Sequence, residues 1–180
     1  MKNTKLLLLF VFTFVVTACT GKPDGMVAVN KFELDRYVGR WYEIARLDHS
    51  FERGLDNITA EYSLRDDGGV KVINRGYSKE DNEWRQAEGK AYFVDDTNSG
   101  HLKVSFFGPF YGSYIIFDLD MKDYQHAFIS GPSTSYLWLL SRTPQVSEKI
   151  IGQFRKRAVE FGFDTSKLIF VEHDLPKNKD

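Results

Sequence analysis

Short stretches in which apolar and polar residues alternate make up most of the chain between residues 41 and 140. Alternation predicts β-strands, because successive side chains of a strand point to opposite faces of a sheet. We expect eight strands, at residues 41–47, 58–64, 70–77, 84–94, 102–107, 114–119, 126–130 and 136–140. Turn-forming stretches such as Asp66-Asp67-Gly68-Gly69 separate them, as is typical of β-hairpins.

Eight consecutive strands with short connections predict an all-β domain. An eight-stranded antiparallel up-and-down barrel is favoured, because a closed barrel leaves no sheet edge unpaired. A two-sheet sandwich would give similar strand spacing, and it stays open as an alternative at this point of the argument.

Residues 143–162 break the β pattern and predict one helix. Thr143 and Pro144 indicate its start, and Gly162 indicates its end. Apolar residues recur at helical spacing, namely Val146, Ile150, Ile151, Phe154, Ala158 and Phe161. Because only one face is apolar, we expect the helix to pack outside the barrel, followed by a short ninth strand at residues 168–171.

The first eighteen residues predict an export signal. Lys2 and Lys5 precede an apolar run at residues 6–16, which is shorter than the roughly 20 residues of a membrane span. The stretch Val16-Thr17-Ala18-Cys19 resembles a bacterial lipobox, so Cys19 is expected to carry lipid, including a chain such as palmitate. We expect residues 19–30 to be a lipidated tether, 31–175 the barrel domain and 176–180 a flexible tail.

The composition of the chain limits the classes of partner and the kinds of chemical site that we expect. The 24 basic and 25 acidic side chains give no basic excess, so no nucleic-acid partner is expected. Cys19 is the single cysteine of the chain, and the four histidines lie far apart in sequence. We therefore expect no metal site and no cofactor, with each histidine at a surface or turn position. The aromatic share of 15% indicates a β-protein with large side chains inside.

Three sequence motifs resemble those of the lipocalin family. Gly39-Arg40-Trp41-Tyr42-Glu43 resembles the family's Gly-x-Trp signature, and Leu139-Leu140-Ser141-Arg142 resembles its third motif. Asp123-Tyr124-Gln125-His126-Ala127 is similar to the second motif only loosely, since Lys122 replaces the usual Thr. Longer blocks at residues 41–46, 51–54, 62–69 and 104–112 resemble bacterial outer-membrane lipocalins, relatives of apolipoprotein D. The resemblance covers residues 32–172.

The resemblance implies a barrel that is closed at one end and holds a ligand inside. The Arg142 guanidinium is expected over Trp41 as a seal, with Gly39 providing a turn or a close approach. The expected ligand contacts are Trp138, Tyr136, Tyr114, Phe106, Phe128 and Leu140. Strand parity from Arg142 places Leu140, Trp138 and Tyr136 inward.

Parity from Trp41 likewise places Glu43, Ala45 and Leu47 inward. A buried Glu43 needs a partner, and we favour a structural role over contact with a ligand headgroup. The apolar connector 107–112 is expected at the open end. It is either a well-packed hairpin or an apolar patch that gates the ligand, touches lipid or forms a homodimer.

The leading hypothesis is a binding protein without catalytic activity. The resemblance implies that it binds a single-chain lipid, either a fatty acid or a lysophospholipid, and stores or transports it for membrane maintenance. The expected location is the periplasmic face of the bacterial outer membrane. By resemblance to the sorting rule of enteric bacteria, an Asp after the lipidated cysteine would indicate retention in the inner membrane, and Thr20 stands at that position. Two alternatives stay open: a lipocalin-fold enzyme or haem-type binder using His126, and an envelope protein without ligand.

Overall fold

The computed structural model describes residues 21–174. The expected export signal at residues 1–18, the expected lipidation site Cys19 and the expected tail at residues 176–180 lie outside the described residues.

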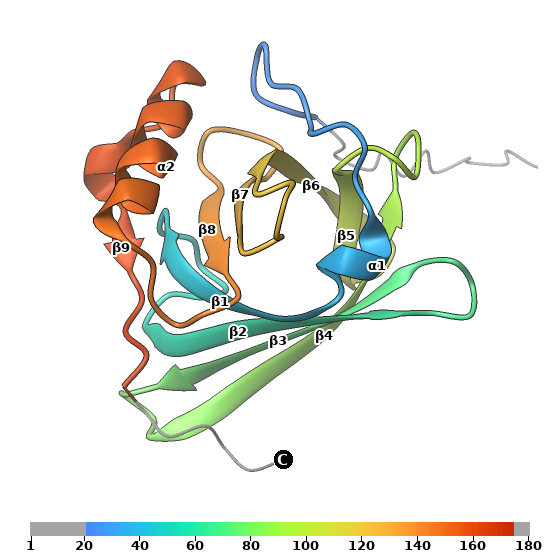
Figure 1. The fold of residues 1–180 in the computed structure, drawn as a ribbon. Coiled ribbons are helices and arrows are strands. Elements are labelled where there is room, and N and C mark those ends of the chain that lie inside the picture. The colour runs from blue at the N-terminus through green and yellow to red at the C-terminus, as the bar shows by residue number, and fades with distance from the viewer. Residues whose placement is uncertain (1–20, 175–180) are drawn as a thin grey trace, which may run out of the picture.

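Eight antiparallel strands form a closed barrel (Figure 1). The strands are β1 (Gly39–Arg46), β2 (Leu55–Leu64), β3 (Val70–Ser78), β4 (Glu83–Phe93), β5 (His101–Phe107), β6 (Phe110–Leu119), β7 (His126–Ser130) and β8 (Leu137–Ser141). Each strand pairs with the next, and β1 pairs with both β8 and β2, which closes the ring. The predicted barrel is therefore confirmed, and the sandwich alternative is wrong.

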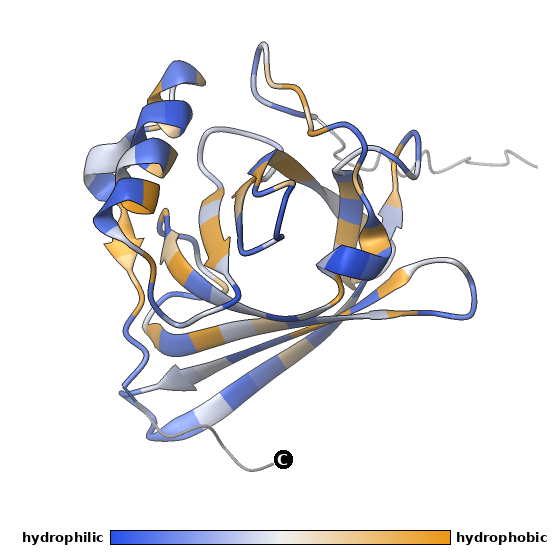
Figure 2. Cartoon of the chain, in the orientation of Figure 1, coloured by the Kyte–Doolittle hydropathy of each residue, from blue (hydrophilic) through white to orange (hydrophobic). Residues whose placement is uncertain are grey.

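Apolar side chains form two clusters, one on each face of the barrel wall. The inner cluster fills part of the interior and includes Trp41, Tyr62, Ala91 and Leu140. The outer cluster lies between the barrel and helix α2 (Glu148–Glu160). Figure 2 shows the corresponding alternation of apolar and polar positions along the strands. Alternate faces of one strand thus serve two separate packing layers.

Helix α2 packs outside the barrel through the predicted apolar face, with Phe154 and Ala158 fully buried. It starts at Glu148 after Ser147, so the prediction of a start at Thr143 is wrong. The Thr143 hydroxyl donates to the Gln145 carbonyl at 2.7 Å, which closes a turn before the helix. Among residues 21–174, no helix has the length and apolar character needed to cross a membrane.

A bulge in β1 reverses its alternation. The pairing of β1 with β8 shifts between Glu43 and Ala45, and such a shift turns later side chains to the other face. Glu43 therefore points inward as predicted, but Ala45 and Leu47 belong to the outer cluster. The prediction that Ala45 and Leu47 face inward is wrong, and Arg46 is buried with Glu43 instead.

The segment before the barrel packs against it. Met26 is 1% exposed within the outer cluster. The Val29 amide donates to the Ile116 carbonyl, and the Gly100 amide donates to the Val29 carbonyl, each at 2.9 Å. The expectation of a tether up to residue 30 is therefore wrong for residues 26–30, which belong to the folded domain.

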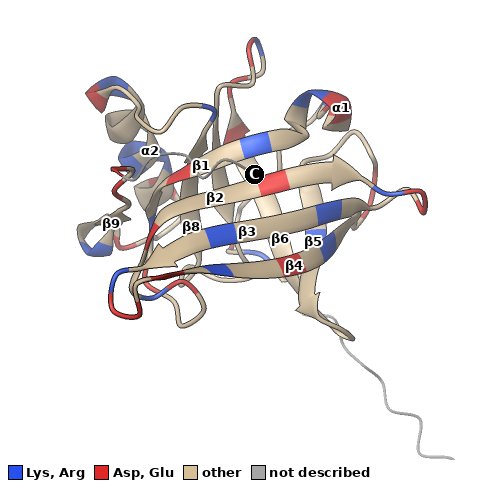
Figure 3. Cartoon of the chain, turned by 90° about the horizontal axis from the view of Figure 1, so that it is seen from below, with Lys and Arg blue, Asp and Glu red and all other residues tan. Residues whose placement is uncertain are grey.

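The two ends of the barrel differ. Helix α1 (Leu34–Tyr37) lies at the closed end, where β1 begins. Strand directions place the loops at residues 47–54, 79–82, 108–109 and 131–136 at the opposite, open end. Figure 3 shows α1 and the β3–β4 hairpin on opposite sides of the molecule.

The C-terminal segment fills a gap in the barrel wall. After the short helix η1 (Thr165–Lys167), strand β9 (Ile169–Phe170) pairs with Ala45 and Arg46 of β1. The Asn57 amide then donates to the Glu172 carbonyl at 2.8 Å. This segment joins β1 to β2 near the open end, where the two strands no longer pair with each other. The predicted ninth strand is confirmed.

Candidate functional site

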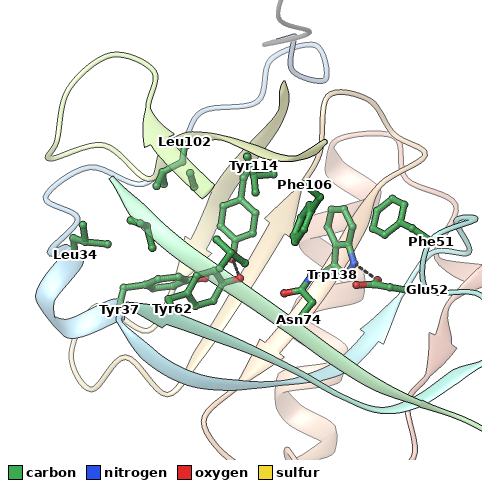
Figure 4. Close-up of a pocket in the computed structure, with 14 residues that line it drawn as sticks. Leu34, Tyr37, Phe51, Glu52, Tyr62, Asn74, Leu102, Phe106, Tyr114 and Trp138 are labelled. Atoms are coloured by element: carbon green, nitrogen blue, oxygen red, sulfur yellow. Dashed lines mark hydrogen bonds between the residues drawn. The ribbon is translucent and has the colours of Figure 1, made fainter. Parts of the chain in front are cut away.

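The barrel encloses an apolar cavity that opens toward a larger mouth pocket. The inner cavity has a volume of about 90 Å³, and the mouth pocket has a volume of about 360 Å³. The inner cavity is lined by Leu34, Tyr37, Phe51, Glu52, Tyr62, Val70, Val72, Asn74, Ala91, Leu102, Val104, Phe106, Tyr114 and Trp138 (Figure 4).

Four residues line both spaces, namely Phe51, Glu52, Asn74 and Phe106. They form the boundary between the interior and the mouth. The mouth pocket alone lies within the range of about 300–1,000 Å³ that is usual for small-molecule sites. The cavity walls are chiefly apolar, so the site suits a ligand with a long apolar part.

Three tyrosine hydroxyl groups meet deep in the cavity. The Tyr114 hydroxyl lies 2.7 Å from that of Tyr37 and 2.9 Å from that of Tyr62. Burial raises the pKa of all three phenols, so they stay protonated at neutral pH. Two hydrogen bonds among three hydroxyls use two protons, which leaves one proton for a ligand or water.

Replacing Tyr114 by Phe is expected to lower the free energy of unfolding by about 1–3 kcal/mol, because Tyr37 and Tyr62 both lose their buried partner. Urea unfolding followed by circular dichroism measures the change. Tyr111→Phe is the control, since no hydrogen bond of its hydroxyl is found in residues 21–174, and it should change stability by less than about 0.5 kcal/mol. Equal stability of the two variants would contradict the role of the Tyr114 hydroxyl.

A buried charged cluster supports the cavity wall near the open end. Arg46 Nη1 lies 2.9 Å from Glu43 Oε1, and both side chains are almost fully buried. Arg46 Nη2 also donates to the carbonyl groups of Glu52 and Leu55. Arg46 thus fixes the loop at residues 47–54 to the barrel.

Glu52 connects this cluster to the cavity. The Trp138 indole N–H donates to Glu52 Oε2 at 3.1 Å, and His49 Nε2 lies 2.9 Å from the same oxygen. Burial and the Glu52 carboxylate raise the pKa of Glu43 well above its usual value. Burial also disfavours ionised Glu52, but His49 and Trp138 outweigh it and lower the pKa of Glu52. The negative charge therefore stays on Glu52, beside the cavity.

The closed end is sealed by Arg142 and Trp41. The Arg142 guanidinium lies 4.0 Å from the centre of the Trp41 ring, in range of a cation–π contact. It donates to the carbonyl groups of Arg36, Tyr37, Val38 and Arg40. Gly39 has a φ of +93°, and a Cβ there would lie 3.4 Å from the Arg142 side chain. The conformation and the close approach both favour glycine.

A barrel sealed at one end, with an apolar cavity and an outer helix, agrees with the sequence comparison. A family model described as a lipocalin-like domain matches residues 32–173. The chain belongs to the lipocalin family.

Relatives and solved structures agree with this membership. The lipocalin is 57% identical over 164 residues to the outer membrane lipoprotein Blc of Vibrio cholerae, covering 91% of this chain and 96% of the relative. Blc of Escherichia coli K12 is 52% identical, with coverage of 88% and 90%. The structure of insecticyanin from the tobacco hornworm Manduca sexta is similar in fold, with a TM-score of 0.68 at 22% identity and coverage of 87% and 88%. The resemblance to bacterial outer-membrane lipocalins is confirmed.

The expected ligand contacts of this lipocalin occupy different places. Trp138, Tyr114 and Phe106 line the inner cavity. Tyr136 stacks on Trp138 near the open end, with ring centres 6.2 Å apart. Leu140 is buried in the inner cluster.

Phe128 lies outside the cavity. It belongs to the outer cluster, and its ring centre is 5.1 Å from that of Phe154 in α2. Its partner across the β7–β8 pairing is Leu139, which also belongs to the outer cluster. Directly paired residues share a face of the sheet, so the prediction that Phe128 contacts the ligand is wrong.

The histidines also differ from expectation. His126 is on the same face as Phe128, with ring centres 5.8 Å apart, so it does not provide a cavity ligand for haem or a catalytic base. His49 is buried, at 6% exposure, but lies in the turn of the loop at residues 47–54, so the expected turn position holds for it. His101 is 9% exposed and begins β5, so the expectation of a surface or turn position is wrong for His101. Within residues 21–174, no group of three or more His, Cys, Asp or Glu side chains is placed to hold a metal ion.

Several site residues were not predicted from the sequence. Tyr37 comes from α1, and Phe51 and Glu52 come from the loop at residues 47–54. Neither segment has a β pattern, so strand parity could not place them. The block Phe51-Glu52-Arg53-Gly54 was part of the family resemblance, and that was the one available indication of a role for this loop.

Proposed function

We propose that this lipocalin binds a single-chain lipid, a fatty acid or a lysophospholipid, and stores or transports it at the outer membrane without catalysis. The observation that carries the proposal is the sealed apolar cavity with its wide mouth. Removal of apolar lipid surface from water, at about 25 cal/mol per Å², supplies the main driving force for binding.

The proposed orientation follows from the shape of the site. The acyl chain points toward the closed end, where the wall consists chiefly of apolar side chains. The polar headgroup stays at the mouth, because the inner cavity of about 90 Å³ is small. Phe51 and Phe106 line both spaces, so a long chain that passes between mouth and interior contacts both rings.

A substitution that fills the cavity tests this proposal. Ala91 is 5% exposed and lines the inner cavity, so Ala91→Phe places a ring where the acyl chain is proposed to lie. We expect its affinity for lysophosphatidylcholine to fall at least tenfold, about 1.4 kcal/mol, in a fluorescence titration. Ser63→Phe is the matched control, because it adds the same ring on the exposed outer face of β2, and it should bind as the unmodified chain does.

Unchanged affinity of a folded Ala91→Phe variant would contradict binding inside the barrel. Conversion of the lysophospholipid into products, measured in the same samples by mass spectrometry, would instead favour an enzyme.

We also propose that Cys19 carries the lipid anchor and that the domain lies at the periplasmic face of the outer membrane. Two relatives are named outer membrane lipoproteins, which supports this location. Cys19→Ala is expected to release the chain from the membrane fraction, because acyl chains hold a lipoprotein on the bilayer. Cell fractionation with immunoblotting measures the release, and Lys22→Ala serves as a neighbouring control. Continued fractionation of Cys19→Ala with membranes would refute the anchor.

A further inference from the structure

Three phenylalanine side chains are exposed around the mouth. Phe107 is 79% exposed, Phe110 is 71% exposed and Phe51 is 56% exposed. All three line the mouth pocket. Phe107 and Phe110 are paired residues at the tip of the β5–β6 hairpin, and Phe51 comes from the loop at residues 47–54. Grouped exposed aromatic side chains indicate a contact surface.

The ligand cavity does not account for this exposure. Phe106 lines the inner cavity and is partly buried, whereas its neighbour Phe107 lines only the mouth pocket and stays 79% exposed. Leu64 is a comparable exposed residue, at 57%, but it lies at the closed end, at the start of the β2–β3 turn. The open end is where exposed aromatic side chains gather.

The N-terminal segment reaches the same end of the barrel. A Cβ added at Gly21 would lie 3.7 Å from the Pro132 carbonyl oxygen, in the open-end loop at residues 131–136. Cys19 precedes Gly21 by two residues, and two residues span at most about 7 Å. A lipid on Cys19 would therefore hold the open end close to the membrane.

We propose that the open end docks on a phospholipid bilayer, with Phe51, Phe107 and Phe110 entering its interfacial region. The proposal rests on the proposed lipid anchor at Cys19. A bilayer is favoured over a second copy of the chain because the anchor and the three aromatic side chains share one end. In this orientation, a lipid passes between bilayer and mouth without crossing bulk water.

Several basic side chains at the open end are paired with acidic ones, so we expect the contact with the bilayer to be mainly apolar. Arg53 pairs with Asp48, and Arg85 pairs with Asp81. Lys79 pairs with Asp56 and with Glu172. Figure 3 shows basic and acidic residues together at the β3–β4 hairpin. Docking should therefore be similar on phosphatidylcholine vesicles and on vesicles that contain phosphatidylglycerol, and should change little with salt.

Spin labels at opposite ends of the barrel test the proposal. The full lipidated chain is reconstituted into phosphatidylcholine vesicles as Phe107→Cys or, as matched control, Leu64→Cys. Cys19 is the single native cysteine and is blocked by its lipid, so each variant has one free thiol for labelling. We expect the label at position 107 to be several-fold more accessible to oxygen, relative to a water-soluble nickel chelate, than the label at position 64.

The possible outcomes separate this proposal from the proposed anchor. Co-sedimentation with vesicles and a water-exposed label at position 107 would overturn docking while leaving the anchor intact. Loss of co-sedimentation would overturn the anchor and docking together. Spin–spin broadening at position 107 without oxygen accessibility would assign the surface to a homodimer and overturn docking. Phe110→Cys repeats the measurement from the opposite strand of the hairpin, with circular dichroism as the check of folding.

Discussion

Replacing Arg46 by Met is expected to lower the free energy of unfolding by about 3–5 kcal/mol, because it removes a buried cation that contacts Glu43 and lies near the buried negative charge of Glu52. Arg46 is 2% exposed, contacts Glu43 and holds the carbonyl groups of Glu52 and Leu55. Loss of these contacts should also free the loop at residues 47–54 and disturb the position of Trp138. Denaturant unfolding measures the stability.

Two control substitutions isolate the effect of burial. Arg53→Met removes the ion pair between Arg53 and Asp48, whose side chains are 65% and 43% exposed, and should leave the denaturant midpoint nearly unchanged because solvent screens such a pair. Glu43→Gln mimics the protonated form that the raised pKa of Glu43 favours, so it should be milder than Arg46→Met. If Arg46→Met were no more harmful than Arg53→Met, the buried cluster would not stabilise the fold.

Replacing Trp41 by Ala is expected to cost about 3–5 kcal/mol, because a large buried ring leaves a cavity behind. Trp41 is 0% exposed, packs on Tyr37 and Arg142, and donates its indole N–H to the Tyr37 carbonyl at 2.8 Å. Thermal and urea unfolding measure the loss. The closed end should also become permeable to water, which amide hydrogen exchange of α1 would detect.

Trp84→Ala is the matched control for this substitution. Trp84 is only partly buried and contacts Tyr77 and Arg75 on the barrel surface, so its loss should cost about 1 kcal/mol or less. Equal losses for the two variants would contradict the sealing role of Trp41.

The sequence pattern predicts where the strands lie, but it does not predict for every side chain whether it points into or out of the barrel. Alternation and turn residues predict the positions of all eight strands, because a strand with one face in the core alternates apolar and polar residues and a hairpin needs turn-forming residues at its end. The β1 bulge at Glu43–Ala45 leaves no trace in that pattern, so parity fails for Ala45 and Leu47. Parity also could not place Phe128, because its facing depends on its register against Leu139.

Among the cavity residues, too, some could be predicted from the sequence and others could not. Trp138 could be placed because Arg142 fixes the inward face of β8. Glu52 and His49 lie in a loop whose conformation depends on contacts between distant residues, above all Arg46 with the Glu52 carbonyl. The Tyr37–Tyr114 hydrogen bond joins residues 77 positions apart in sequence. Such pairings require the closed barrel itself, which is why sequence reasoning did not find them.

Titration of the folded chain with a lysophospholipid, followed by indole fluorescence, tests the central claim of lipid binding most directly. Trp138 lines the cavity and Trp41 lies sealed under Arg142, so a bound acyl chain should change the emission of Trp138. The account predicts a saturable change at micromolar lipid that is absent in Trp138→Phe. No change in the unmodified chain, with its fold intact by circular dichroism, would contradict a lipid-binding barrel.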